Sequence, residues 1–181
     1  MKISSKGDYA LRTILTLSLK IDDKKPVRLP EIAEQNSIPV KFLEQIMIQL
    51  KGAGLVSSRR GRHGGYLLAK DPSTITLGHV IRLIDGSVAP MGCVSTSDYN
   101  ACSLEPKCVL KKVFSDVNAR IADIIDRITF SDLCKQVLEN RDKETGEAQA
   151  THPSPSALRI SDPGKGKSLN SVIATSSIKL G

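Results

Sequence analysis

Hydrophobic residues recur at helical spacing near the start of the chain. Leu11, Ile14 and Leu15 fall on one face when successive residues advance by a helical step. Ser5 precedes this stretch and is followed by a carboxylate three residues later, as at a capped helix start. The pattern therefore predicts an amphipathic helix over residues 5–20.

Two helices joined by a short turn are predicted next. A proline and a glutamate favour a first helical turn, so a short helix is predicted over residues 29–36. A tight turn at residues 36–39 leads into a second helix that stops at Gly52 or Gly54. The apolar face of this second helix consists of Leu43, Ile46, Met47 and Leu50. Two helices with so short a connection match a helix-turn-helix.

The opposite face of that second helix is polar. Lys41, Gln45 and Gln49 are one helical turn apart, and Glu44 lies beside them. Gln can pair with adenine and Glu can accept from the cytosine amino group, so these side chains suit contacts with DNA bases. A plain solvated face is the alternative; the preceding turn and the segment that follows favour DNA.

Residues 55–68 predict a β-hairpin, because two β-prone runs flank a glycine-rich tip. Arg59, Arg60 and Arg62 lie at this tip and suit contacts with phosphates or a minor groove. His63 is interpreted as a polar residue of the hairpin rather than a ligand. A hairpin after a helix-turn-helix is the wing of a winged helix, so the predicted fold is mainly α with a small β-hairpin wing.

A short helix beginning after Thr76 is followed, after a loop, by the longest helical stretch, at about residues 109–128. Its apolar residues are spaced by three and four positions and form a stripe. The stripe consists of Leu110, Val113, Val117, Ile121, Ile124 and Ile128, widened by Phe114 and Ile125. It favours pairing with a second copy of the chain, which would make this a dimerisation helix; packing within one domain is the alternative.

Positive charge is concentrated at the N-terminal side. Residues 1–70 contain 13 Lys and Arg against 6 Asp and Glu, and the remainder contains 13 of each, so the first part carries the net charge of +7. Such a distribution favours binding to a polyanion, although a solubilising surface has the same composition.

The ends of the chain lack features of a membrane or secreted protein. No apolar run approaches the ~20 residues of a membrane span, and residues 1–6 contain no apolar signal region, so a cytoplasmic location is expected. From about residue 139 the composition turns polar. Residues 139–181 are therefore predicted to be a disordered tail behind one domain of residues 1–138.

Three of the four cysteines lie close together in a predicted loop of about residues 87–108. Cys93, Cys102 and Cys108 have the spacing C-x8-C-x5-C, which lacks the close cysteine pairs of a structural zinc site. Soft thiolates suit an iron–sulfur cluster, and an exposed thiolate suits an oxidation switch, while zinc or a structural role is the third option. Cys134 is interpreted as a small buried residue.

Six short segments stand out along the chain: residues 5–12 (SKGDYALR), 42–45 (FLEQ), 54–58 (GLVSS), 64–68 (GGYLL), 81–86 (IRLIDG) and 129–133 (TFSDL). Together they resemble the Rrf2 family of bacterial winged-helix transcriptional regulators, which includes the IscR, NsrR and RirA types. They occur in the family's order and cover about residues 1–138. Phe42, within the second segment, is therefore grouped with the expected DNA-contacting residues.

The resemblance implies a homodimer that binds a palindromic operator in double-stranded DNA and usually represses transcription. It also implies a [2Fe–2S] or [4Fe–4S] cluster on Cys93, Cys102 and Cys108, which senses iron or cluster status, redox state or nitric oxide. IscR-like members use a histidine three residues after the last cysteine, where this chain has Lys111. NsrR-like members use an N-terminal aspartate of the partner subunit, to which Asp8 corresponds, so Asp8 is the candidate fourth ligand.

Two other classes of function fit less well. One is a winged-helix repressor that needs no ligand or responds through a thiol switch. The other is an enzyme, which is disfavoured because the sequence contains no C-x-x-C, no phosphate-binding glycine loop and no Ser/His/Asp grouping. No small-molecule substrate and no membrane partner are expected.

Overall fold

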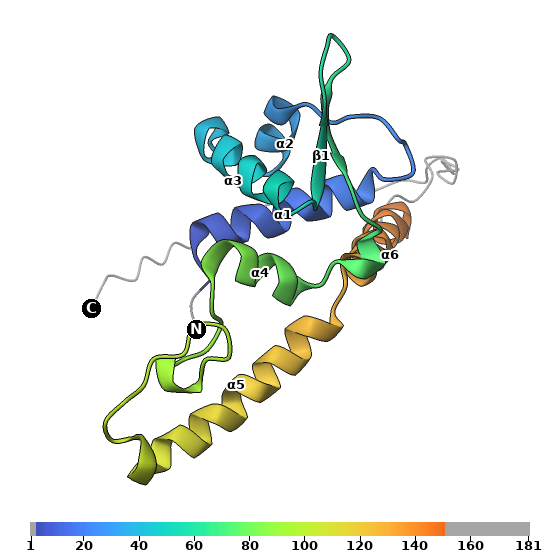
Figure 1. Cartoon of the computed structure of the whole chain (residues 1–181). Coiled ribbons are helices and arrows are strands. Elements are labelled where there is room, and N and C mark those ends of the chain that lie inside the picture. Colours follow the sequence, from blue (N-terminus) through green and yellow to red (C-terminus); the bar gives the residue numbers. More distant parts are fainter. Residues whose placement is uncertain (1–2, 151–181) are drawn as a thin grey trace, which may run out of the picture.

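The structure, a computed structural model, describes residues 3–150, with side chains described as far as residue 143. It is mainly helical, with one two-stranded antiparallel sheet (Figure 1). The α-helices are α1 (Ser5–Leu19), α2 (Leu29–Gln35), α3 (Val40–Gly52), α4 (Leu77–Asp85), α5 (Val109–Arg127) and α6 (Phe130–Ala150). The strands are β1 (Val56–Arg59) and β2 (Gly65–Leu68), and single 3-10 turns are η1 (Pro72–Thr74), η2 (Gly92–Val94) and η3 (Glu105–Lys107). The predicted mainly α fold with a hairpin wing is confirmed.

The residue that caps helix α1 lies one position before the predicted cap. The Ser4 hydroxyl accepts from the Gly7 N–H at 3.0 Å, so Ser4 caps the helix and the prediction of Ser5 was wrong by one position. The Ser4 main-chain N–H also donates to the Asp85 carboxylate at 2.9 Å, which joins the start of α1 to the end of α4. The fully buried side of α1 includes Ala10 and Ile14.

Helices α2 and α3 pack on α1 and enclose the main core. Asn36 follows α2, and its side-chain N–H donates to the Thr16 hydroxyl of α1 at 3.0 Å. Ser37 has a positive φ of 54° and reverses the chain between the two helices. The buried apolar side chains come from these three helices, from β1 and the residue before it, from α4 and from the start of α6; they include Ile14, Ile32, Leu43, Ile46, Met47, Leu50, Leu55, Val56, Val80 and Phe130.

The wing is a short antiparallel ladder that runs from the pair Val56–Leu68 to the pair Arg59–Gly65. Val27 adds a single bridge to Tyr66 on the other edge of β2, with N–H···O distances of 2.9 and 2.8 Å. A Cβ on Gly65 would lie 2.5 Å from the Val27 carbonyl oxygen, so this close approach requires glycine.

Helix α5 forms a long arm on the side of the molecule opposite the wing (Figure 1). Arg82 of α4 donates to both oxygens of Asp126 of α5, at 2.6 and 2.9 Å. Ile81, Val88 and Ile125 form a second apolar cluster between α4, the loop after it and α5. The loop containing the three cysteines therefore starts and ends on elements that are joined to each other.

Helix α6 extends beyond residue 138, where the predicted domain ends. It continues to Ala150, so the predicted tail boundary near residue 139 falls inside a helix. Residues 139–150 (ENRDKETGEAQA) are mostly good helix formers, and the prediction weighed their polarity rather than their helix propensity. The rest of the predicted tail, residues 151–181, lies outside the described residues. Between residues 3 and 150, no helix combines the length and hydropathy that crossing a membrane requires.

Candidate nucleic-acid interface and cysteine loop

Helix α3 separates its apolar and polar residues as the sequence predicts. Leu43, Ile46 and Leu50 have no exposed surface, whereas Lys41, Glu44, Gln45 and Gln49 are exposed on the other side. The apolar face fixes the rotation of α3 about its axis, because turning the helix would expose that face. Burial of the apolar face therefore makes the polar face point outward.

Two apolar side chains accompany the polar ones on the exposed side of α3. Phe42 is 58% exposed and Ile48 is 64% exposed. Sequence reasoning included Phe42 but assigned Ile48 neither to the apolar face nor to the DNA-contacting residues. Exposed apolar side chains on a DNA-binding helix suit contact with the thymine methyl group.

The wing and α3 lie on the same side of the molecule, away from α5 (Figure 1). Lys51 near the end of α3 donates to the Ser58 hydroxyl of β1 at 2.9 Å, which ties the two elements together. Arg59, Arg60 and Arg62 are exposed. The structure thus brings the predicted helix residues and the predicted wing residues to one surface.

Arg28, the residue before α2, is a cation beside the wing that sequence reasoning missed. Its guanidinium donates to the Arg62 main-chain carbonyl at 2.9 Å. The two residues are 34 positions apart in the sequence, so no local sequence pattern predicts the contact. Arg28 braces the wing tip and adds a fourth cation to the same surface.

The three cysteines of the loop are free thiols in different surroundings. Cys93 is buried in η2, Cys102 is exposed, and Cys108, the residue before α5, is half-buried. Among the described residues, no group of three or more Cys, His, Asp or Glu side chains is close enough to hold a metal ion. The structure places the three thiols on one loop but does not gather their sulfur atoms.

The Cys93 end of the loop is fixed to α5. Asn118 of α5 is buried, and its side-chain N–H donates to the Val94 carbonyl at 3.0 Å. The Ser95 hydroxyl contacts the Ser87 hydroxyl at 2.6 Å and accepts from the Asp98 N–H at 2.8 Å. These bonds hold the residues around Cys93, whereas Cys102 has no comparable burial.

The other end of the loop carries a polar cluster around Glu105. The Glu105 carboxylate forms an ion pair with Lys111 of α5 and accepts from the Tyr99 hydroxyl at 2.7 Å. The hydrogen bond from Lys111, and then that from Tyr99, hold the pKa of Glu105 below its usual value. Lys111, at the position where a histidine ligand was considered, is therefore engaged with a carboxylate.

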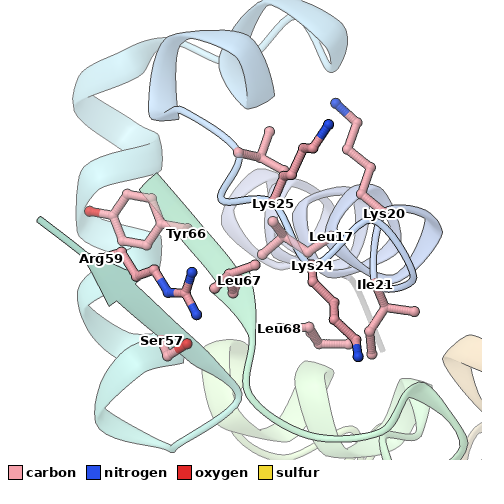
Figure 2. A pocket seen from close by; sticks show the side chains of 11 residues that line it. Leu17, Lys20, Ile21, Lys24, Lys25, Ser57, Arg59, Tyr66, Leu67 and Leu68 are labelled. Atoms are coloured by element: carbon pink, nitrogen blue, oxygen red, sulfur yellow. The ribbon is translucent and has the colours of Figure 1, made fainter. Parts of the chain in front are cut away.

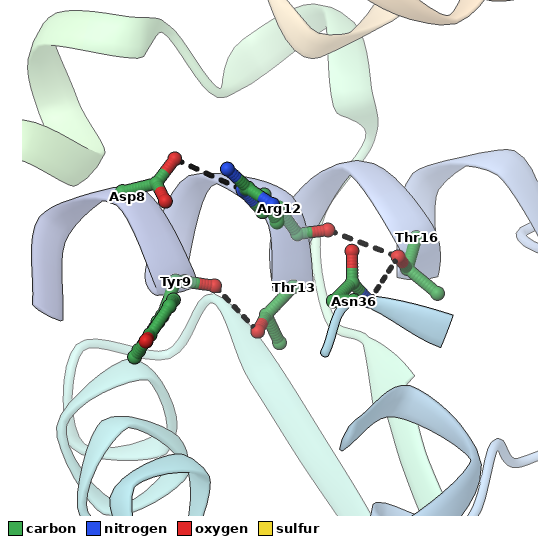
Figure 3. A network of polar contacts seen from close by, with 6 residues as sticks. All are labelled: Asp8, Tyr9, Arg12, Thr13, Thr16 and Asn36. Carbon is green, nitrogen blue, oxygen red and sulfur yellow. Dashed lines mark hydrogen bonds and ion pairs between the residues drawn. The ribbon is translucent and has the colours of Figure 1, made fainter. Parts of the chain in front are cut away.

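Asp8 lies in the first turn of α1, where a carboxylate stabilises a helix by itself. It pairs with Arg12 one turn later, at 3.0 Å, and both side chains are about half exposed (Figure 3). Within one chain it belongs to α1 and not to the cysteine loop. Cys134 on α6 is half-buried rather than buried, and burial raises the pKa of its thiol.

Helix α5 exposes most of its predicted apolar stripe. Val113 is 57% exposed, Ile124 is 59% exposed and Leu110 is 55% exposed, whereas Ile125 is buried against α4. One side of α5 is therefore used inside the chain, and the other side presents an apolar row to the surroundings.

Residues 3–136 match the family model of Rrf2, described as an iron-dependent transcriptional regulator. The chain belongs to the Rrf2 family. The match spans the winged helix, the cysteine loop, α5 and the start of α6, as the sequence segments predicted.

Relatives of known name agree with this assignment. The chain is 36% identical over 154 residues to the HTH-type transcriptional regulator IscR of Vibrio campbellii, covering 84% of this chain and 89% of that protein. Among solved structures, CymR (YrzC), the global cysteine regulator of B. subtilis, matches with a TM-score of 0.65 at 30% identity, covering 75% of this chain and 98% of that one. T. potens IscR matches with a TM-score of 0.59 at 32% identity, covering 76% and 88%.

The Rrf2 assignment determines the broad function. This chain is a transcriptional regulator of the DNA-binding, winged-helix type, and the expectation that it is not an enzyme agrees with its relatives, which are named as regulators. The resemblance found in the sequence segments is confirmed.

Proposed function

We propose that this Rrf2-family regulator is a homodimeric repressor whose operator affinity depends on an iron–sulfur cluster held by Cys93, Cys102 and Cys108. The observation that carries the proposal is the placement of three free thiols on one loop that connects α4 with α5. Thiolates are the usual ligands of such clusters, so the donor chemistry fits. Since Cys102 is exposed and the sulfurs are not grouped, binding would draw the middle of the loop towards Cys93.

DNA contact is assigned to α3 and the wing. Lys41, Gln45 and Gln49, with Phe42 and Glu44, would face the bases of a major groove, and Arg59, Arg60 and Arg62 would contact phosphates or a minor groove. The exposed stripe of α5 would pair two copies, so that two α3 helices meet a palindromic site.

The loop can influence DNA binding through its two attachments. Asp85, directly before the loop, binds the first turn of α1, and Asn118 joins η2 to α5. A bound cluster supplies electron-transfer chemistry and a reaction site for nitric oxide. Bringing the three thiols together would favour one arrangement of α4 relative to α5. The resulting change in DNA affinity cannot exceed the difference in the free energy of cluster binding between the two arrangements.

The experiment that tests this function begins with anaerobic purification of the full chain. We expect a coloured dimer containing iron and sulfide, with salt-dependent binding to a palindromic duplex. Replacing Cys93, Cys102 and Cys108 with Ala should abolish the colour and change operator affinity. Cys134→Ala is the matched control and should keep both the colour and the operator affinity of the wild type. A colourless, iron-free wild type with full regulation, or a triple variant that regulates normally, would contradict the proposal.

Asp8 is proposed as the fourth ligand, supplied by the partner subunit. Asp8→Ala and Arg12→Ala break the same ion pair, but only the first removes a carboxylate. Ligation predicts that Asp8→Ala alters the visible spectrum of the cluster and Arg12→Ala does not. If both variants keep the wild-type spectrum, Asp8 serves only to stabilise α1.

A thiol switch is the second candidate function, favoured by the exposure of Cys102. Exposed thiolates oxidise readily without a metal. In this case the anaerobic protein would be iron-free, and peroxide would change operator affinity in the wild type but not in Cys102→Ala.

A further inference from the structure

A cavity of about 310 Å³ lies between the end of α1, the loop that follows it and the wing (Figure 2). Its volume is at the lower end of the ~300–1,000 Å³ range of small-molecule sites. The cysteine loop, α5 and the exposed face of α3 contribute none of its lining residues. Arg59 of the wing is therefore the one residue that the cavity shares with the candidate DNA-contacting and cysteine sites described above.

The cavity has an apolar floor. Leu17 of α1 and Val27 are almost completely buried beneath it, and Ile21, Leu67 and Leu68 are half-buried around it. Tyr66 and Ser57 of the wing complete the wall (Figure 2). A floor of this kind favours an apolar group, because burying it removes apolar surface of both partners from water.

The remaining lining residues are all cations: Lys20, Lys24, Lys25 and Arg59, with no carboxylate among them (Figure 2). Lys20 forms an ion pair with Glu31 of α2. In the described part of the chain, Lys24, Lys25 and Arg59 have no such partner. An anion in the cavity would therefore meet three cations that no carboxylate neutralises.

The backbone places one of these cations at a conformational cost. Lys24 has a φ of +50°, which a residue other than glycine rarely adopts, and its N–H donates to the Ile21 carbonyl at 3.2 Å. The turn brings Lys24 and Lys25 to the cavity together with Ile21. Strained positions of this kind persist where the surroundings fix them, and they are common at ligand sites.

We propose that this cavity binds a small organic anion, a carboxylate attached to a short apolar body, and that the bound anion competes with DNA for Arg59. The apolar floor distinguishes this ligand from a DNA phosphate, which is charged and hydrated and would gain nothing from Leu17 or Leu68. The competition rests on the proposed DNA contact of Arg59, whereas the binding of the anion does not. By linkage, DNA would weaken anion binding by the same factor.

Calorimetric titration of the full chain with octanoate, and with neutral octanamide as the matched ligand, tests the site. We expect saturable one-to-one binding of octanoate, and binding of octanamide weaker by about tenfold. The double variant Lys24→Asn/Lys25→Ala should weaken octanoate binding by about tenfold. Asparagine is used at position 24 because it tolerates a positive φ.

The control for charge is Lys107→Ala/Lys112→Ala, which removes two exposed lysines outside the cavity and should bind octanoate as the wild type does. Absence of saturation, equal binding of octanamide, or equal binding by the Lys24/Lys25 variant would each overturn the proposed site.

Operator affinity at constant ionic strength tests the competition. Octanoate should weaken DNA binding by the wild type and by the control variant, and should have little effect on Lys24→Asn/Lys25→Ala. Octanoate binding without any effect on DNA affinity would overturn the competition alone. Loss of DNA affinity in the Lys24/Lys25 variant, with no octanoate binding by the wild type, would assign the cavity lysines to DNA phosphates. Octanoate binding by a protein that binds no operator would refute the proposed function and leave the site intact.

Discussion

The side-chain amide of Asn118 donates to the Val94 carbonyl at 3.0 Å, and its oxygen has no partner in the described part of the chain. Both residues are buried. The bond joins the middle of α5 to the residue after Cys93, so it holds the Cys93 end of the loop against the arm. The amide of Asn118 thus donates a hydrogen bond through its N–H but accepts none through its oxygen, and substitutions at this position can test the two groups separately.

Asn118→Asp should destabilise the protein far more than Asn118→Leu. Aspartate removes the donor and places a carboxylate against a carbonyl, at a cost of about 3 kcal/mol or more. Leucine also removes the donor but eliminates the unpaired oxygen, so a cost of ~1 kcal/mol is expected. Urea unfolding of the two variants measures the difference. Equal destabilisation would mean that the Val94 contact does not form in solution.

Acid should release Glu105 from Lys111. The pKa of Glu105 is lowered in the folded state, so the pair contributes stability above the ordinary glutamate pKa of about 4.3 and loses it as the pH falls through the folded value. The carboxyl carbon shift of Glu105 in an NMR titration gives this value directly. Lys111→Met should raise the pKa of Glu105 towards the ordinary range. Lys112→Met, one residue later, should leave the pKa of Glu105 unchanged. An unchanged pKa of Glu105 in the Lys111→Met variant would exclude the ion pair with Lys111 as the cause of the lowered pKa.

Arg60→Ala and Gln45→Ala should weaken DNA binding in different ways. Loss of a phosphate contact at Arg60 lowers affinity for all sequences and reduces the salt slope by about 1. Loss of a base contact at Gln45 should relax the preference at one base pair, by about 1–3 kcal/mol. Fluorescence anisotropy at several salt concentrations separates the two effects. Arg120→Ala, on α5, is the control; an Arg60 variant that behaves like it would remove the wing tip from the interface.

Val113→Glu should dissociate the proposed dimer. Val113 is exposed on the apolar stripe of α5, and a carboxylate there would be buried without a partner if two α5 helices pair. Ser115→Glu places the same charge two residues away, off the stripe, and should leave the dimer intact. Sedimentation equilibrium measures both. Dissociation by both variants, or by neither, would argue against pairing through this stripe.

Alkylation should distinguish three of the four thiols, Cys102, Cys93 and Cys134. Cys102 is exposed and should react first with iodoacetamide, whereas Cys93 is buried and should be protected. Burial raises the pKa of Cys134, so its thiolate fraction is low at neutral pH and its reaction should accelerate as the pH rises. Peptide mass spectrometry over time gives each rate. Rapid labelling of Cys93 would mean that η2 opens readily.

Local patterns were sufficient to predict the winged helix. The apolar spacing of Leu43, Ile46 and Leu50 determines which face of α3 is buried. The glycines between the two strands of the wing predict its turn. Contacts between distant residues were not accessible in the same way. The bond from Arg28 to Arg62 and the cavity beside the wing depend on how elements pack, and no periodicity encodes either.

The cysteine loop shows the same limit at the candidate site. The sequence identifies three thiols and a carboxylate, but the burial of Cys93 follows from η2 packing against α5, which only the fold reveals. Ile48 was missed for a related reason. Its chemistry predicts burial, while its position on α3 places it outside.

The guanidinium of Arg82 and the carboxylate of Asp126 join the helix before the cysteine loop to the helix after it. Val88, at the start of the loop, packs with Ile81 of α4 and Ile125 of α5, so the first residues of the loop also belong to this junction. The exposed segment around Cys102 lies outside both contacts, so we expect a change of length between Cys93 and Cys102 to leave the junction of α4 with α5 intact.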